Sequence, residues 1–126
     1  MYKLLLILLL ISSTVKSQEV IFCERVDAYG NAWNRSTEFK VSDKGGFLKI
    51  LVKLNKKVES KVVTFDIYNV SGEKSVLENT IHMEVNPSLT WFYKEFTFFK
   101  EGNYEVYVFD EKDKLLGVGK MTIKLK

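Results

Sequence analysis

Side chains that commonly perform chemistry are scarce in this chain. Among its 126 residues there is one histidine, His82, and one cysteine, Cys23. His82 alternates with Ile81 and Met83, which predicts a place on the solvent side of a strand rather than a catalytic or ligand role. Hydroxyl nucleophiles need a positioned base, and no serine motif surrounds this histidine. The sequence therefore predicts no catalytic residue, no cofactor and no enzyme activity.

Metal binding is also not expected. Zinc and copper sites need several nitrogen or sulfur ligands that converge, and one histidine with one cysteine does not supply them. Asp110, Glu111 and Asp113 form a carboxylate cluster of the kind that binds calcium or cleaves glycosides in other settings. Lys112 and Lys114 interrupt this cluster, and the spacing of a calcium loop is absent. We expect a solvated hairpin turn here.

Aromatic side chains are the remaining candidates for binding. Tyr68 on one expected strand, and Tyr107 and Phe109 on another, point outward and would form one patch if the two strands are neighbours. Tyrosine combines a large apolar area with a polar tip, which suits recognition of a protein or a sugar. Aromatics are also good strand formers that pair across strands without any ligand. The sequence leaves both interpretations open.

A second aromatic candidate lies in a loop. Tyr29 and Trp33 belong to the segment DAYGNAWNR, residues 27–35, which Gly30-Asn31 marks as a turn. A loop tryptophan can stack on a sugar ring or anchor a partner, and it can equally fold down and plug the open end of a sheet structure. Trp91 and Tyr93 begin a strand, so we expect them in core or edge packing.

Alternating apolar and polar residues predict strands throughout and no helix. In residues 47–54, for example, Leu48, Ile50 and Val52 share one face while lysines occupy the other. The first strand and residues 80–85 are expected at sheet edges, where an exposed strand can accept another chain. The eight expected strands are residues 19–26, 37–41, 47–54, 61–70, 80–85, 91–99, 103–110 and 115–125.

The segment FTFFKEGNYEVYVF, residues 96–109, indicates the fold. An aromatic strand reaches Gly102 two residues before Tyr104, and strict alternation then resumes. An immunoglobulin-like sandwich turns its E–F corner in this way, with the tyrosine ring in the core and its hydroxyl bonded to upstream backbone. We predict an all-β, immunoglobulin-like antiparallel β-sandwich of about seven or eight strands. An open Greek-key barrel is the alternative.

The start of the chain predicts export. A positive charge in Met1-Tyr2-Lys3 precedes the apolar residues 4–11 and a polar stretch, so residues 1–17 are predicted to be a secretory signal peptide cleaved after Ser17. The apolar run is far shorter than the roughly 20 residues that span a bilayer, so we expect no membrane insertion after cleavage. Residues 18–126 are predicted to form a single domain in the periplasm, on the outer surface or in the medium.

The net charge and the single cysteine of residues 18–126 limit the classes of partner that we expect. Removing residues 1–17 takes away Lys3 and Lys16 but no acid, which lowers the formal net charge from +3 to +1. No basic run interleaved with aromatics suggests a nucleic-acid surface, and nucleic acid is excluded as a partner. Cys23 has no partner within the chain, which predicts a buried thiol, with an intermolecular disulfide as the alternative.

Several segments of the sequence resemble small exported immunoglobulin-like domains of Bacteroidetes, a family without a characterised activity. The resemblance covers nearly all of residues 18–126 and implies an envelope or extracellular location and a noncatalytic role. It supplies no functional residues. The segments that carry it are Gln18, FCERVDAYGN at 22–31, GGFLKILVKL at 45–54, FDIYNV at 65–70, ENTI at 78–81, TWFYKEFTF at 90–98 and EGNYEVYVFDE at 101–111.

These observations predict a noncatalytic binding or structural module that acts by protein association in the cell envelope. Its expected binding face consists of Tyr68, Tyr107 and Phe109, and its expected partner is another envelope or extracellular protein. The alternative is a carbohydrate-binding domain that uses Tyr29 and Trp33, with a glycan as its ligand. Neither an oligomeric state nor the identity of the ligand is predicted.

Overall fold

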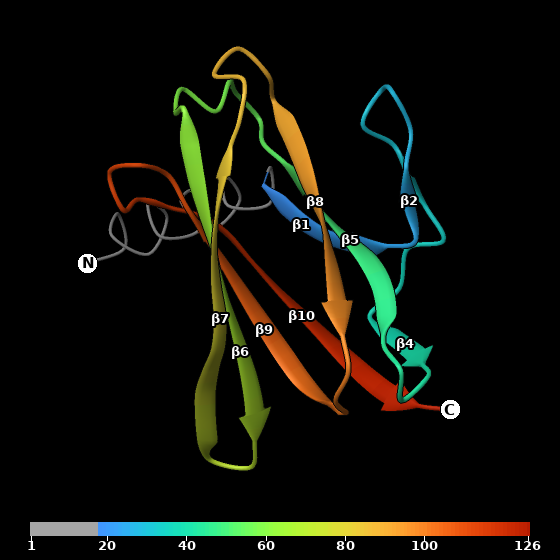
Figure 1. The fold of residues 1–126 in the computed structure, drawn as a ribbon. Helices are drawn as coiled ribbons and strands as arrows, with labels where there is room; N and C mark the ends of the chain where they lie inside the picture. The colour runs from blue at the N-terminus through green and yellow to red at the C-terminus, as the bar shows by residue number, and fades with distance from the viewer. Residues whose placement is uncertain (1–17) are drawn as a thin grey trace, which may run out of the picture.

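The computed structural model describes residues 18–126, and over this range the chain is all-β (Figure 1). No helix in that range is long and apolar enough to cross a membrane. The strands are β1 (Glu19–Cys23), β2 (Arg25–Val26), β3 (Ala32–Trp33), β4 (Glu38–Val41), β5 (Gly46–Lys53), β6 (Val62–Ser71), β7 (Lys74–Glu84), β8 (Trp91–Phe98), β9 (Gly102–Phe109) and β10 (Leu115–Leu125).

The ten strands form three sheets. One has the order β1-β5-β8, the second has the order β4-β10-β9-β6-β7, and β2 pairs with β3 in a small hairpin. Every pairing is antiparallel except that of β4 with β10, which is parallel. The predicted all-β class is confirmed.

Two details of the prediction are corrected. The strand count is ten rather than seven or eight, because the first predicted strand is interrupted at Glu24 and the expected loop contributes β3. The chain leaves the sheet after Cys23 and returns at Ser36, whose backbone N–H donates to the carbonyl of Phe22 at 3.1 Å. The parallel entry of β4 beside β10 means that the structure is not purely antiparallel.

The two larger sheets share one hydrophobic core. Phe65 on β6 packs edge-on against Phe92 and Phe96 of β8, with ring centroids 6.1 and 5.3 Å apart. Aromatic pairs favour this geometry because the positive edge of one ring meets the negative face of the other. As strand alternation predicts, the inward-facing side chains of β5, β6 and β9 are buried, while Ile81 and Met83 of β7 are only partly buried. The buried residues are Leu48, Ile50, Val52, Val63, Phe65, Ile67, Tyr104, Val106 and Val108.

Tyr104 stabilises the turn that connects β8 with β9. Its hydroxyl donates to the backbone carbonyl of Lys100 at 2.8 Å, and its ring packs edge-on against Phe98 with centroids 5.0 Å apart. This hydrogen bond satisfies a buried hydroxyl and fixes the corner at the same time. The predicted link from the tyrosine hydroxyl to upstream backbone is confirmed.

At one side of the core, β1 and β10 approach each other closely although they belong to different sheets. This contact depends on Gly119, since an added Cβ would lie 2.7 Å from Val20 and 2.8 Å from the ring of Phe22. At Gly117 an added Cβ would lie 2.9 Å from Val20. The missing side chains on β10 therefore make room for the inward side chains of β1.

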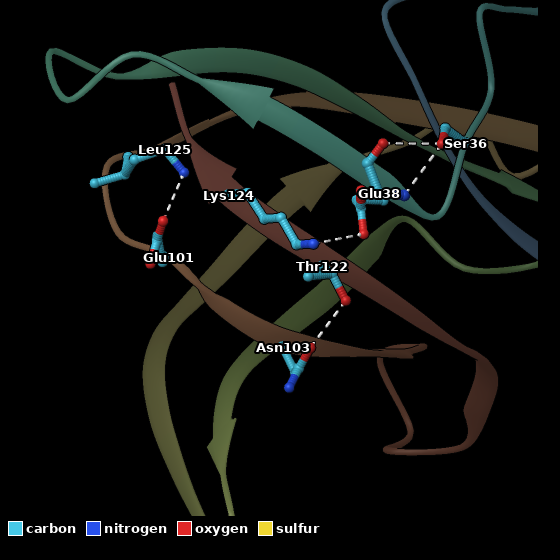
Figure 2. Close-up of polar contacts among 7 residues, drawn as sticks. All are labelled: Ser36, Glu38, Glu101, Asn103, Thr122, Lys124 and Leu125. Carbon is cyan, nitrogen blue, oxygen red and sulfur yellow. Dashed lines mark hydrogen bonds and ion pairs between the residues drawn. The ribbon is translucent and has the colours of Figure 1, made fainter.

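Polar contacts hold β4 and β10 in the five-stranded sheet (Figure 2). The Lys124 ammonium lies 3.4 Å from the Glu38 carboxylate on β4, while the Thr122 hydroxyl donates to the Asn103 side chain on β9 at 2.8 Å. Near the chain end, the backbone N–H of Leu125 donates to the Glu101 carboxylate at 3.0 Å. The first contact joins β10 to β4, and the other two join β10 to β9 and to the turn before it.

The β2–β3 hairpin covers part of the outer face of the three-stranded sheet. Ile21, Cys23 and Leu51 point to that face, yet they are buried in a second small cluster with Val26 and Ala32 of the hairpin. Burial raises the pKa of the Cys23 thiol above its ordinary value and favours the neutral form. The predicted buried thiol is confirmed.

Replacing Gly119 tests the close approach of β1 to β10. We expect Gly119→Ala to lower the free energy of unfolding by about 1–3 kcal/mol, because its Cβ would overlap Val20 and Phe22. Urea denaturation measures this, with Val118→Thr on the exposed face of the same strand as a control that changes stability by less than about 0.5 kcal/mol. Equal stability of the glycine variant and the native protein would contradict the packing.

Replacing Tyr104 tests the corner hydrogen bond. Tyr104→Phe should cost about 1 kcal/mol at neutral pH, the net value of one hydrogen bond. Burial, aided by the Glu78 carboxylate, raises the pKa of Tyr104 from 10.0 to about 12. A raised folded-state pKa stabilises the native protein below pH 10, and this contribution is lost as pH climbs toward 12.

The stability difference between the native protein and Tyr104→Phe should therefore shrink above pH 10. Denaturant unfolding at a series of pH values measures it. A difference that stays constant through this range would mean that the hydroxyl titrates as in the unfolded chain.

Candidate binding surfaces

The pairing of β6 with β9 brings the predicted aromatic patch together. Asp66 lies opposite Tyr107 and Tyr68 lies opposite Glu105, so the two tyrosines are diagonal neighbours on the outer face. Their rings meet edge to face, with centroids 5.5 Å apart and planes at 83°. Together with Phe109 and Ser75 they line a shallow depression of about 280 Å³. The predicted proximity is confirmed, while a binding role for these residues stays a prediction.

Strand register extends this patch by three apolar side chains that the sequence analysis missed. Leu77 on β7 lies opposite Tyr68, and on β10 Val118 lies opposite Tyr107 and Leu115 opposite Phe109. These three are 49, 41 and 44% exposed, respectively. We call the resulting surface the aromatic stripe; it crosses four strands and consists of Leu77, Tyr68, Tyr107, Phe109, Val118 and Leu115.

Polar neighbours orient the central tyrosine of the stripe. The Tyr107 hydroxyl donates to the Glu105 carboxylate at 3.2 Å, and Lys120 approaches the same carboxylate at 3.6 Å. The negative charge of Glu105 raises the pKa of Tyr107 above its ordinary value and so favours the neutral phenol. The ring is thus held by a hydrogen bond at its tip and by its edge-to-face contact with Tyr68, while part of it remains exposed.

Asp27 organises the loop that carries the second aromatic candidate. Its carboxylate accepts hydrogen bonds from the backbone N–H groups of Tyr29 and Asn31, both at 2.9 Å. The side-chain amide of Asn31 at 3.2 Å and the indole N–H of Trp33 at 3.5 Å donate to its other oxygen. The bond from the Asn31 backbone, with smaller contributions from the other donors, lowers the pKa of Asp27.

The structure separates the two loop aromatics. Trp33 is 49% exposed, and the guanidinium of Arg25 lies over its ring at 4.7 Å from the centroid. Tyr29 is at the loop tip and is 85% exposed, while Gly30 packs on the indole of Trp91. Trp33 therefore does not plug the core. A carbohydrate site at Tyr29 and Trp33 stays a prediction.

Trp91 has the predicted packing role, whereas Tyr93 is 40% exposed. They are stacked on the outer face of β8 with ring planes 7° apart and centroids at 6.4 Å. Trp91 packs against the small cluster under the β2–β3 hairpin. Aromatic stacking on this face stabilises the hairpin rather than the central core.

The polar candidates occupy structural positions. His82 is exposed on β7, where its Nδ1 lies 2.9 Å from the hydroxyl of Thr64 on the neighbouring strand. Asp110 accepts hydrogen bonds from the backbone N–H groups of Lys112 and Lys114 at 2.8 and 2.9 Å, which closes the turn between β9 and β10. Residues 18–126 contain no cluster of three or more histidine, cysteine or carboxylate side chains that could hold a metal ion.

Comparison with known proteins gives a structural similarity but no family. No family model matches the sequence, and no curated protein does. Solved structures that match include a superoxide reductase (neelaredoxin) from Ignicoccus hospitalis and a variant of that reductase. The variant is 11% identical, with a TM-score of 0.45 over 85% of this chain and 82% of that one. The other is 9% identical, with a TM-score of 0.45 over 87% of this chain and 80% of that one.

This finding contradicts the prediction that the chain is not an enzyme, since both matched structures are named as reductases. The prediction relied on the lack of a local catalytic motif. Catalytic groups converge through folding and need not be close in sequence, so a missing motif does not exclude them. The prediction is withdrawn. At this level of similarity no activity, metal or residue role is carried to this chain.

Proposed function

We propose that this protein is an exported binding module that associates with another protein of the cell envelope or extracellular space through its aromatic stripe. The observation that carries this proposal is the fixed contact between Tyr68 and Tyr107 on the outer face. Tyrosine is enriched among the residues that dominate binding energy at protein interfaces. The export signal predicted at residues 1–17 lies outside the described residues and supports this location from sequence alone.

We further infer that the fold is an immunoglobulin-like sandwich. Three features support this assignment. The strand orders are β1-β5-β8 and β4-β10-β9-β6-β7, and the chain passes from β1 in the smaller sheet to β4 in the larger one. The third feature is the tyrosine corner at Tyr104. The resemblance of the sequence to exported domains of Bacteroidetes agrees with it. In this interpretation the stripe lies on the outer face of the larger sheet.

The shape and composition of the stripe favour a protein partner over a small ligand. Small-molecule sites are concave and usually have a volume of about 300–1,000 Å³. The depression at Tyr68 and Tyr107 is about 280 Å³ and opens onto a sheet face with exposed apolar side chains on both sides. A partner surface can cover the whole stripe and remove these side chains from water, which is the main favourable term in association.

Substituting the two tyrosines tests the proposal. Tyr68→Ala with Tyr107→Ala should leave the fold intact, because both side chains point away from the core, and should weaken partner binding by at least tenfold. The measurement compares capture of proteins from an envelope extract by the native and variant proteins. Circular dichroism and denaturation establish that the variant is folded.

A matched control uses the same sheet face outside the stripe. Thr80→Ala with His82→Ala removes two exposed side chains of β7 and should leave capture unchanged. Undiminished capture by the tyrosine variant, or equal losses in both variants, would contradict binding through the stripe.

A further inference from the structure

The two larger sheets are unequal, and this leaves a groove at one side. One sheet has three strands and the other has five, no pairing joins β7 to β8, and in Figure 1 the β6–β7 hairpin reaches below the end of β8. The groove between β7 and β8 has a volume of about 400 Å³. Its apolar lining includes Ile67, Ile81, Phe96, Phe98 and Tyr104. Glu78 and Glu95 also line it, and Glu95 forms an ion pair with Lys49.

The free edge of β8 forms one wall of this groove. β8 pairs with β5 over eight residues without a register shift, and within residues 18–126 no strand pairs with its other edge. A long and regular edge presents alternating N–H and C=O groups that can pair with an extended chain. By contrast, the pairing of β7 with β6 shifts register at Ile67 and Tyr68, which disturbs the edge across the groove.

Lys94 restricts which chain this edge can accept. It lies opposite Ile50, which is completely buried, so Lys94 occupies an inner-face position between Phe92 and Phe96. It is half-buried, and the four ion pairs formed within residues 18–126 do not include it. A lysine at an inner-face position of an edge strand opposes pairing with an apolar strand. A carboxylate opposite Lys94 would remove that penalty.

We propose that the groove binds an extended segment of another protein, which adds to β8 as an antiparallel strand. This segment carries an acidic residue opposite Lys94 and apolar residues opposite Phe96 and Phe98. Because the segment runs antiparallel to β8, its first paired residue lies opposite Phe98, its third opposite Phe96 and its fifth opposite Lys94. The first and third residues are apolar, and the fifth is acidic. Apolar side chains would enter the groove, and backbone bonds to β8 would supply affinity.

A second copy of this chain that paired through its own β8 would not place an acidic residue opposite Lys94. A two-fold axis would place inner-face residues of one β8 opposite inner-face residues of the other. Those residues are Phe92, Lys94, Phe96 and Phe98, and none is acidic. The proposal is also independent of the aromatic stripe, which lies on the outer face of the other sheet.

Two defined peptides test this proposal. Both are capped at each end; one has the sequence Thr-Leu-Thr-Leu-Thr-Glu-Thr, and the other has lysine in place of glutamate. Each is titrated into isotope-labelled protein, and amide shifts are followed by NMR. We expect shifts centred on β8 and the groove, with the glutamate peptide binding about tenfold more tightly, because the other peptide places like charges together.

Variants of Lys94 make the test specific. Lys94→Glu should reverse the preference between the two peptides, and Lys94→Gln should abolish it. The Tyr68→Ala/Tyr107→Ala variant should bind both peptides as the native protein does, which separates this proposal from the one for the stripe. Equal affinity for the two peptides, shifts located away from β8, or no shifts at millimolar peptide would each overturn the proposal.

Discussion

The register between β6 and β9 is the constraint on which the rest of the structure depends. It places Phe65 and Ile67 beside Val106 and Val108 in the core, and it places Tyr68 beside Tyr107 on the outside. Because side chains alternate along a strand, a slip of one residue would exchange these two sets. The burial of the inner set therefore fixes the geometry of the outer set. The core packing already holds the outer side chains in place, so a binding surface on this face needs no further interactions to position them.

The two sides of the core differ because β10 and β8 differ in sequence. Glycines at 117 and 119 let β1 approach β10 closely, and the two sheets nearly meet there. Opposite them, β8 carries large aromatic residues and an inward lysine, and a groove lies between β8 and β7. The molecule thus has a closed side that stabilises it and two accessible surfaces, the stripe and the groove, to which we propose that other chains bind.

Alternation in the sequence predicted most of the strands and the inward side chains, because burial on one face imposes a period of two. The Tyr104 hydrogen bond and the burial of Cys23 were also predictable from local sequence. Leu77, Leu115 and Val118 were missed as parts of the stripe, since their neighbours depend on register across strands and on irregular pairing near β7 and β10. The β2–β3 hairpin was missed because Asp27 organises it through side-chain bonds.

Site-specific photo-crosslinking in the cells that produce the protein tests most directly whether the aromatic stripe contacts another protein. A photoreactive phenylalanine analogue replaces Val118 in the stripe or Glu84 on the same sheet outside it, and adducts are examined after irradiation. Association through the stripe predicts a discrete adduct with another protein from position 118 and none from position 84. Absence of an adduct at 118, or the same adduct from both positions, would contradict it.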